Sequence, residues 1–352
     1  MEHPYLKDQL IAYIGNKRAL QGFLAGVFER LGRERGTFLD PFAGSGAVAR
    51  LARYVGFRVL ANDWEFYAYV LNYAYLCIEQ SEAQHLFGER GGLEGILAEL
   101  NGLPDPLEHA QYIARHYAPR RTETADYRRE RLFYTRENAL RIDAVRNRIE
   151  ALYPGFDLDE SRRKEKLLLL AALLYQSATH VNTSGVFKAC HKGFGGHGRD
   201  ALGRILAPIR LAMPELIDRP AGAEVFCQDA EAFVRGRSGD ICYLDPPYNQ
   251  HQYGSNYHLL NTIALWDRPP VSGERRADGR LKHNAGIRAD WTRTRSEFCY
   301  RGTASRALER LLEAVDARFL VLSYNTEGII PFEELAAMLE KQGSLKLFAS
   351  PY

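Results

Sequence analysis

This sequence lacks long hydrophobic runs and a strong net charge. Its longest apolar run, residues 167–175, has nine residues, whereas a membrane-spanning helix needs roughly 20, so we expect a buried helix there. Residues 1–10 have no apolar core of the signal-peptide type. The net charge of the 352 residues is +2, which excludes polyanion binding through overall charge and directs attention to local charge.

Cysteines are also few, odd in number and widely spaced. The sequence has five of them and no CxxC pair, so the usual ligand spacing of a structural zinc site is missing. Cys190, His191 and His197 come nearest to a ligand cluster, but a second pair is absent. We therefore predict reduced thiols, no metal site, no membrane association and a cytoplasmic protein.

Six short apolar runs have the pattern of buried parallel strands. They are nearly continuous in apolar residues, as strands covered on both faces usually are. Helical patterns lie between several of them, which predicts an α/β fold with a doubly wound, mostly parallel sheet. The runs are residues 37–40, 58–62, 224–227, 241–244, 319–323 and 345–348.

The strand–helix alternation stops between about residue 80 and residue 220. Helical patterns at residues 93–100, 137–152, 163–179 and 202–213 take its place. We predict a discontinuous core of residues 1–80 and 221–352 with an inserted helical region at 81–220. Two arginine-rich stretches, 115–148 and 274–310, are either solvated faces or nucleic-acid contacts, and the aromatic residues within the first favour nucleic acid.

A glycine-containing turn follows the first predicted strand. Pro41-Phe42-Ala43-Gly44-Ser45-Gly46 precedes a helix, and such turns let the backbone approach a ligand closely. The two glycines alone are a weak signal, and Ala49 stands where a dinucleotide fingerprint would have its third glycine. The second strand ends at Asp63, about 20 residues on, where a carboxylate can accept hydrogen bonds from ribose hydroxyls.

Asp245-Pro246-Pro247-Tyr248 closes the fourth predicted strand. Two prolines cannot continue a central ladder, so the chain leaves the sheet with its carbonyls free. The exocyclic amine of a base is a poor nucleophile because its lone pair is delocalised into the ring. Asp245 and the Pro246 carbonyl can accept both amine hydrogens, while Tyr248 can stack on a base taken out of the duplex. The alternative is a rigid turn capped by Asp245.

Taken together and in this order, these motifs and Tyr13-Ile14-Gly15-Asn16-Lys17 resemble the α-type adenine-N6 DNA methyltransferases, the D12 or Dam-like class. The resemblance implies a Rossmann-like class I methyltransferase core with an inserted, mainly helical target-recognition domain. It also implies S-adenosylmethionine as cofactor and duplex DNA as substrate. That class usually has a seventh strand, and this chain stops just past the sixth run, so we expect the last strand to be missing, truncated or supplied differently.

The resemblance also assigns residues to the cofactor. Gly44 and Gly46 would line its methionine part, Asp40 its amino-acid end and Asp63 its ribose, while Asp229 would accept from the adenine amine or serve only as a helix N-cap. Lys17 would lie near the cofactor or the DNA backbone. The complete predicted set is Tyr13, Gly15, Lys17, Asp40, Pro41, Phe42, Gly44, Gly46, Asp63 and Asp229.

Residues 180–187 resemble the Asn-x-x-Gly-x-Phe hairpin with which this family presses into DNA. A glycine-rich loop with basic residues follows, which suits phosphate and base-edge contacts, although a plain surface loop is the alternative. Residues 252–258 would flank the flipped base, and Asn325 would line the same pocket. The predicted DNA-binding residues are Asn182, Thr183, Lys188, His191, Lys192, Tyr253 and Asn256.

The resemblance therefore predicts site-specific methyl transfer to N6 of a flipped adenine, catalysed by Asp245, Pro246, Pro247 and Tyr248. A restriction–modification role, with a cognate endonuclease as a separate protein, and association with a prokaryotic nucleoid are part of this expectation. The alternatives are an RNA adenine or guanine amino-methyltransferase, because related RNA enzymes also carry Asp-Pro-Pro-Tyr, and a non-catalytic nucleic-acid-binding module.

Overall fold

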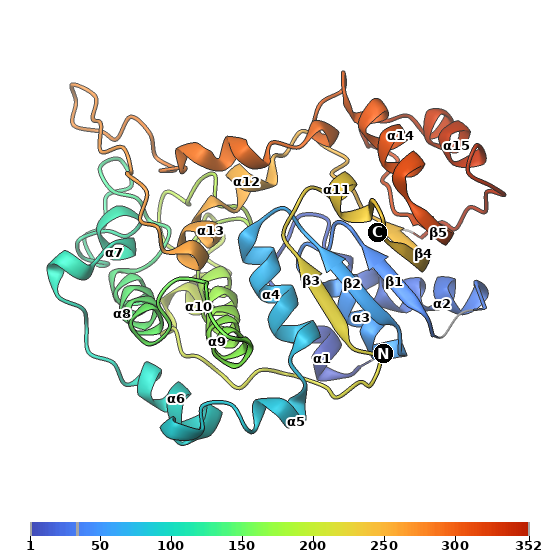
Figure 1. The fold of residues 1–352 in the computed structure, drawn as a ribbon. Coiled ribbons are helices and arrows are strands. Elements are labelled where there is room, and N and C mark those ends of the chain that lie inside the picture. The colour runs from blue at the N-terminus through green and yellow to red at the C-terminus, as the bar shows by residue number, and fades with distance from the viewer. Residues whose placement is uncertain (1, 33–34, 351–352) are drawn as a thin grey trace.

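A five-stranded, all-parallel sheet in the order β3-β2-β1-β4-β5 forms the centre of the computed structural model (Figure 1), which describes residues 2–32 and 35–350. The first two predicted strands are confirmed to the residue, and the next three within a few positions. The predicted α/β class is therefore confirmed. The strands are β1 (Thr37–Asp40), β2 (Arg58–Asn62), β3 (Ala223–Phe226), β4 (Ser238–Leu244) and β5 (Asp316–Leu322).

Successive side chains of the central strand β1 point to opposite faces of the sheet, as strand geometry requires. Phe38 joins a buried cluster on one face with Val59 and Ile241. Leu39 joins a second cluster on the other face with Leu60 and Cys242. Both faces are therefore covered, which explains why these strands are nearly continuous in apolar residues.

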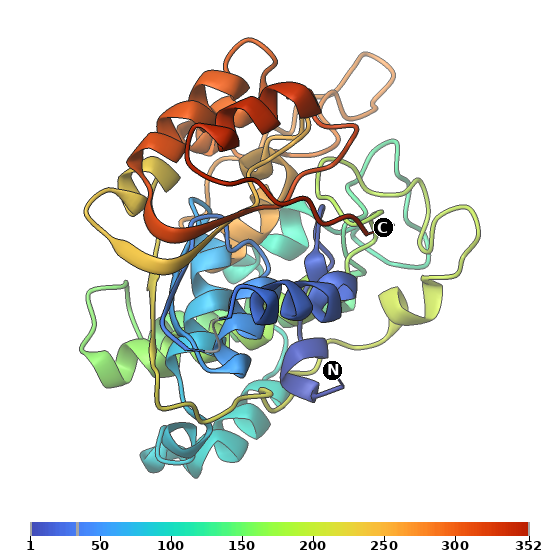
Figure 2. The ribbon, with the colours of Figure 1, turned by 90° about the vertical axis from the view of Figure 1, so that its right-hand side faces the viewer.

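Helices from different parts of the chain cover the two faces. The first cluster includes side chains of α2 (Gln21–Arg30), α3 (Ala47–Val55) and α4 (Phe66–Cys77). The second includes side chains of α14 (Ala304–Ala314) and α15 (Phe332–Glu340). Figure 2 shows these two C-terminal helices, in orange and red, on one side of the sheet and the dark-blue N-terminal helices on the other. The sheet is thus doubly wound.

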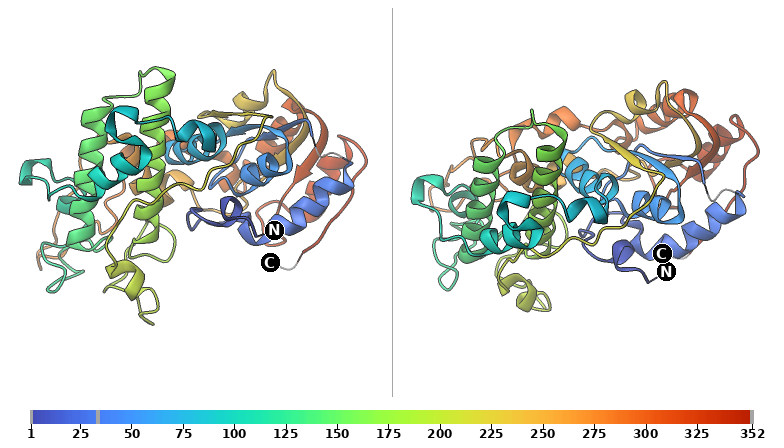
Figure 3. Two further views of the ribbon diagram at one scale, coloured as in Figure 1. Left: turned by 90° about the horizontal axis from the view of Figure 1, so that it is seen from below. Right: turned by 60° about the horizontal axis from the view of Figure 1, so that its bottom comes forward.

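The segment between β2 and β3 is mainly helical and lies beside the sheet (Figure 3). Its helix α9 packs against α4, and its apolar run is buried within the cluster of the first face, which confirms the buried helix expected there. The main helices after α4 are α5 (Gln80–Ala83), α6 (Gly92–Asn101), α7 (Ile113–His116), α8 (Arg136–Leu152), α9 (Glu160–Thr179) and α10 (Leu202–Leu206).

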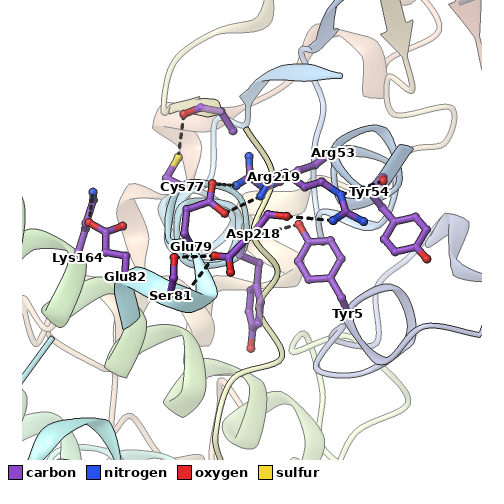
Figure 4. A network of polar contacts seen from close by, with 12 residues as sticks. Tyr5, Arg53, Tyr54, Cys77, Glu79, Ser81, Glu82, Lys164, Asp218 and Arg219 are labelled. Atoms are coloured by element: carbon purple, nitrogen blue, oxygen red, sulfur yellow. Dashed lines mark hydrogen bonds and ion pairs between the residues drawn. The ribbon is translucent and has the colours of Figure 1, made fainter. Parts of the chain in front are cut away.

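Polar contacts join the two ends of this segment, where the chain leaves the core and returns to it (Figure 4). The Glu79 carboxylate pairs with Arg53 of α3 and accepts a 2.8 Å hydrogen bond from the Arg219 backbone. Asp218 Oδ1 accepts from both the backbone and the hydroxyl of Ser81, each at 2.9 Å. These contacts fix the two ends of the inserted region to the core, in addition to the packing of α9 against α4.

Two predictions about secondary structure were wrong. The helix expected at residues 202–213 ends at Leu206, because Pro208 lacks an N–H and disfavours the helical conformation of the residue before it. The strand expected at 345–348 is not formed, and residues 343–350 contain no strand. Leu345 and Leu347 are 38% and 70% exposed there, so the run has no face to bury, and Phe348 instead approaches Arg30 of α2.

No helix in the described ranges is long and apolar enough to cross a membrane. All five cysteines lie within those ranges, and none of them forms a disulfide. Among the same residues, no group of three or more His, Cys, Asp or Glu side chains could hold a metal ion.

Candidate active site

A cleft opens at the carboxyl ends of the parallel strands, the edge at which open α/β sheets bind ligands. Its empty volume is about 1040 Å³, open solvent included. The loops after β1, β2, β3 and β4 line it, and so do residues 294–298. The lining residues include Ile14, Gly15, Lys17, Pro41, Phe42, Asp63, Glu65, Asp229, Asp245, Pro246, Pro247, Tyr248 and Tyr253.

Asn62, the last residue of β2, holds two of these loops to that strand. Its side-chain nitrogen donates to the carbonyls of Pro41 and Gln228, at 3.2 and 2.9 Å. Its oxygen accepts from the Gln228 backbone at 3.1 Å. Because Asn62 is 1% exposed, these bonds are shielded from water and fix the loops after β1 and β3 relative to β2.

Gly44 lies where no larger residue fits. Its φ is +51°, and a Cβ there would lie 2.8 Å from Cε1 of Tyr13. The Tyr13 ring is in turn stacked on Tyr257, with centroids 4.8 Å apart and planes 16° apart. The N-terminal motif is thereby held against the glycine turn. Gly46 is constrained likewise, since its φ is +83° and a Cβ would lie 2.7 Å from Oδ1 of Asn72.

Two aspartates stand beside this turn, Asp40 buried and Asp63 half-buried. Asp40, at the end of β1, is 1% exposed, and its Oδ1 has no hydrogen-bond partner in the described structure. Burial, and then the charge of Asp245, raise the pKa of Asp40 well above its usual value. Asp63 accepts from the backbone of Gly44 at 2.8 Å and of Glu65 at 2.9 Å. Burial raises the pKa of Asp63 to about 6, although these hydrogen bonds oppose the rise.

Asp229 lines the cleft and also begins a helix. Its Oδ1 accepts hydrogen bonds from the backbones of Glu231 and Ala232, at 2.9 and 3.2 Å, at the start of α11 (Ala230–Val234). The N-cap role is therefore present. Asp229 also lines the cleft. Capping α11 therefore does not exclude a role in cofactor binding.

The loop after β4 places Tyr248 between two other segments. Its carbonyl accepts a 2.9 Å hydrogen bond from the Ile329 backbone, and its ring meets Tyr324 edge to face at 6.0 Å. On another side lies Gly15, where a Cβ would be 3.3 Å from the Tyr248 hydroxyl oxygen. The ring is thus positioned by packing before any base is present.

Asp245 is paired with Lys17, from the motif near the N-terminus. Lys17 Nζ donates to both carboxylate oxygens of Asp245 and to the Gly15 carbonyl, at 2.8 Å. Burial raises the pKa of Asp245, and the Lys17 charge and hydrogen bonds oppose that rise. From the sequence, Lys17 was expected near the cofactor or the DNA backbone. In the structure it directly contacts the proposed catalytic carboxylate.

Glu65 is a functional candidate that sequence reasoning missed. It is 3% exposed, and its carboxylate accepts a hydrogen bond from the Asn261 side chain. Burial raises the pKa of Glu65 to about 7, and the Thr294 hydroxyl opposes that rise. Glu65 follows the motif residue Asp63 by two positions, and nothing in the sequence around it indicates that it is buried.

The cleft wall at residues 294–298 was also not foreseen. Gln252 and the Ser296 backbone exchange two hydrogen bonds, at 2.9 and 2.8 Å. Phe298 meets Phe42 edge to face, with centroids 5.4 Å apart. These contacts bring the second arginine-rich stretch over the cofactor loop.

The structure separates the predicted DNA-binding residues into two groups. Asn182 and Thr183 are 0% and 6% exposed. Asn182 donates to Leu132 O at 2.9 Å and accepts from the backbone of Gly195 at 3.1 Å. Its amide orders the glycine-rich loop from inside, so the expectation of direct DNA contact by these two side chains does not fit this conformation.

The remaining predicted residues differ in exposure. Lys192 is exposed, Lys188 and His191 are half-buried, and Tyr253 lines the cleft. Asn256, in α12 (Tyr253–Asn256), is 1% exposed and its amide has no partner in the described structure. The side chain of Asn325 is exposed and caps a turn at Glu327. It is not part of the cleft lining, contrary to expectation.

Comparisons with known proteins show the family of this chain. The family model of the D12 class N6 adenine-specific DNA methyltransferases matches residues 13–335. The type II methyltransferase M.NlaIII of Neisseria lactamica is 33% identical over 344 residues, which cover 97% of this chain and 91% of that protein. No solved structure matches the chain.

Two longer relatives are similar over part of their length. The type II methyltransferase M.FokI of Planomicrobium okeanokoites is 28% identical over 97% of this chain and 49% of its own length. The modification methylase LlaI of Lactococcus lactis subsp. lactis is 30% identical over 94% of this chain and 48% of its own length.

Proposed function

The chain belongs to the D12 class of N6 adenine-specific DNA methyltransferases, and on that premise we propose that Asp245–Tyr248 receives a flipped adenine from duplex DNA. One observation carries this proposal: the loop that would hold the amine opens into the same cleft as Asp63 and as Pro41 and Phe42 at the start of the glycine turn. Neither alternative, an RNA enzyme or a non-catalytic binding module, is favoured by the family or by the relatives.

Methyltransferases of this family use S-adenosylmethionine, and the side chains of the cleft fit it. The unpartnered Oδ1 of buried Asp40 suits an ammonium group such as that of its methionine part. Asp63 keeps lone pairs for ribose hydroxyls beyond its two backbone bonds. Asp229 stands further along the cleft for the adenine amine. When bound, this cofactor supplies an electrophilic methyl group on a sulfonium.

The protein's own contribution is to position and polarise the amine. Lys17 favours the charged form of Asp245, and the carboxylate retains acceptor sites beyond the bonds to Lys17. Asp245 and the Pro246 carbonyl accept the two amine hydrogens, which draws the nitrogen towards a tetrahedral geometry and frees its lone pair. Tyr248 holds the ring by stacking. Positioning and fixed dipoles are thus the main catalytic devices.

We further propose that residues 1–80 and 221–352 are the catalytic core and that residues 81–220 recognise the target sequence. Support comes from the contacts that join the two ends of the inserted segment at the core and from its exposed basic residues. Because the relatives are named type II methyltransferases and modification methylases, we propose a role in restriction–modification beside a separate cognate endonuclease. Its place in the cell would then be on DNA, in the nucleoid of a prokaryote.

The test is to express the protein in a host without DNA methylation and to map modified bases by single-molecule sequencing. We expect N6-methyladenine at one sequence motif in DNA and none with the Asp245→Ala variant. Modified bases in RNA alone would overturn the proposal, as would a modified amino group on cytosine.

A further inference from the structure

The two arginine-rich stretches, far apart in the sequence, meet in the structure. Residues 274–282 form a hairpin, with an antiparallel bridge between Arg275 and Leu281. Leu281 donates from its backbone to the Arg128 carbonyl at 2.8 Å, and Arg275 Nη1 donates to the Arg129 carbonyl at 3.1 Å. Figure 1 shows this orange hairpin projecting above α7. The hairpin and the loop at residues 120–129 thus make one surface.

A buried arginine fixes the base of the hairpin. Arg131 is 6% exposed, and its Nη2 donates to the carbonyls of Ser272 and His283, at 2.6 and 2.8 Å. Tyr117 donates from its hydroxyl to the Gly286 carbonyl at 2.8 Å. Both chain segments that lead into the hairpin are therefore held to the inserted region. Its arginines are presented on a built support, which lowers the entropy lost when they bind.

Three of the four carboxylates in residues 120–129 and 274–282 pair within this surface: Glu274, Asp278 and, with Arg129, Asp126; Glu123 is the fourth. Glu274 pairs with Lys282 at 3.0 Å and Asp278 with Arg280 at 3.3 Å. Glu130 accepts from the Arg120 backbone at 2.9 Å. Five exposed arginines remain for which the described part of the chain holds no carboxylate within 4.0 Å: Arg120, Arg121, Arg128, Arg275 and Arg276.

The glycine-rich loop adds a further cation to this surface. The Tyr127 ring lies 5.4 Å from Arg128 Cζ and 5.9 Å from Lys192 Nζ, measured from the ring centroid. Cations from two segments therefore gather around one aromatic side chain. The positive charge here exceeds what internal pairing requires, and such an excess on a fixed support suits a polyanion.

We propose that residues 120–129, residues 274–282 and Lys192, named here the basic arm, grip the phosphate backbone of duplex DNA beside the target sequence. This inference rests on the proposed DNA substrate and adds a contact surface to it. Planar guanidinium groups match phosphate geometry in a bidentate manner. Backbone contacts of this kind set affinity and register and do not read sequence.

The test compares the wild type with an Arg128→Gln/Arg276→Gln double variant. Binding is measured against salt concentration on two duplexes several helical turns long, one of mixed sequence and one carrying the mapped target motif. We expect the slope of log K against log salt to fall by about 2 for the double variant, because each lost phosphate contact removes about 1. The fold loss should be the same on both duplexes, with an unchanged target motif.

Arg58→Gln is the matched control. Arg58 is exposed at the amino end of β2, whereas the cleft lies at the carboxyl ends of the strands. It should leave the slope unchanged. An unchanged slope in the double variant would overturn the inference, and so would a changed target motif, which would mean base reading. The binding assay does not depend on methylation. The salt slope could depend on the basic arm in a protein that methylates no DNA. That result would contradict the proposed function and would still support the phosphate contact by the arm.

Discussion

Lys17 Nζ lies 2.9 and 2.7 Å from the two carboxylate oxygens of Asp245, although the residues are 228 positions apart. Lys17 is 7% exposed, so little water screens the pair. The pair joins the N-terminal motif to the loop after β4. In this pair, Lys17 favours the charged form of the Asp245 carboxyl, which lies beside buried Asp40.

Asp245→Ala should abolish methyl transfer, because the amine then loses its charged acceptor. S-adenosylmethionine should still bind, since Asp40, Gly44 and Asp63 lie on other loops. Radiolabelled methyl transfer and calorimetric cofactor binding measure the two effects separately. Near-normal transfer by this variant would contradict the proposed mechanism.

Lys17→Met should move the acidic limb of the kcat profile to higher pH. Burial already raises the pKa of Asp245, and Lys17 opposes that rise, so its removal raises the pKa further and increases the protonated fraction of the carboxyl. We expect kcat near pH 7 to fall by about 10²-fold or more and to recover in part at higher pH. Lys17→Arg keeps the charge and should keep the limb. An equal loss of kcat at every pH in Lys17→Met would contradict this role.

Glu65→Gln should stabilise the protein more at pH 8 than at pH 5. Burial raises the pKa of Glu65 from 4.5 to about 7. The stabilisation due to the protonated form is therefore complete below pH 4.5 and is lost as pH rises through 7. Between pH 5 and 8 the wild type should lose about 2–3 kcal/mol that the variant keeps.

Denaturant unfolding at the two pH values measures this difference. Glu89→Gln changes an exposed glutamate and should show no such pH dependence. If the gap between Glu65→Gln and wild type is constant from pH 5 to pH 8, then Glu65 does not titrate in this window.

Asn182→Ala should lower the free energy of unfolding. Its side chain bonds Leu132 O and the Gly195 backbone in a buried site, and a buried partner left unpaired costs roughly 1–3 kcal/mol. Hydrogen exchange in residues 191–198 should also become faster. The exposed Lys192→Gln should leave stability unchanged. A variant with normal stability and lost DNA binding would restore the direct DNA role expected from the sequence.

Local patterns in the sequence were enough for most of the core. The strands β1 and β2 were predicted to the residue because strands covered on both faces are apolar throughout and end sharply at polar turns. The two motif loops followed from glycine and proline chemistry at the ends of β1 and β4. Residues 345–348 had a similar apolar run, but no neighbouring surface covers it, and a short pattern cannot report that.

The sequence by itself therefore determined the class of fold, the family and the motif loops after β1 and β4, because those depend on residues close together in the chain. Only the tertiary structure decided that Lys17 pairs with Asp245, that Asn182 is buried and that Arg128 lies beside the hairpin carrying Arg276. Each of these contacts joins segments whose separation in the chain leaves no periodic or local signal. Their geometry depends on how whole elements pack against one another.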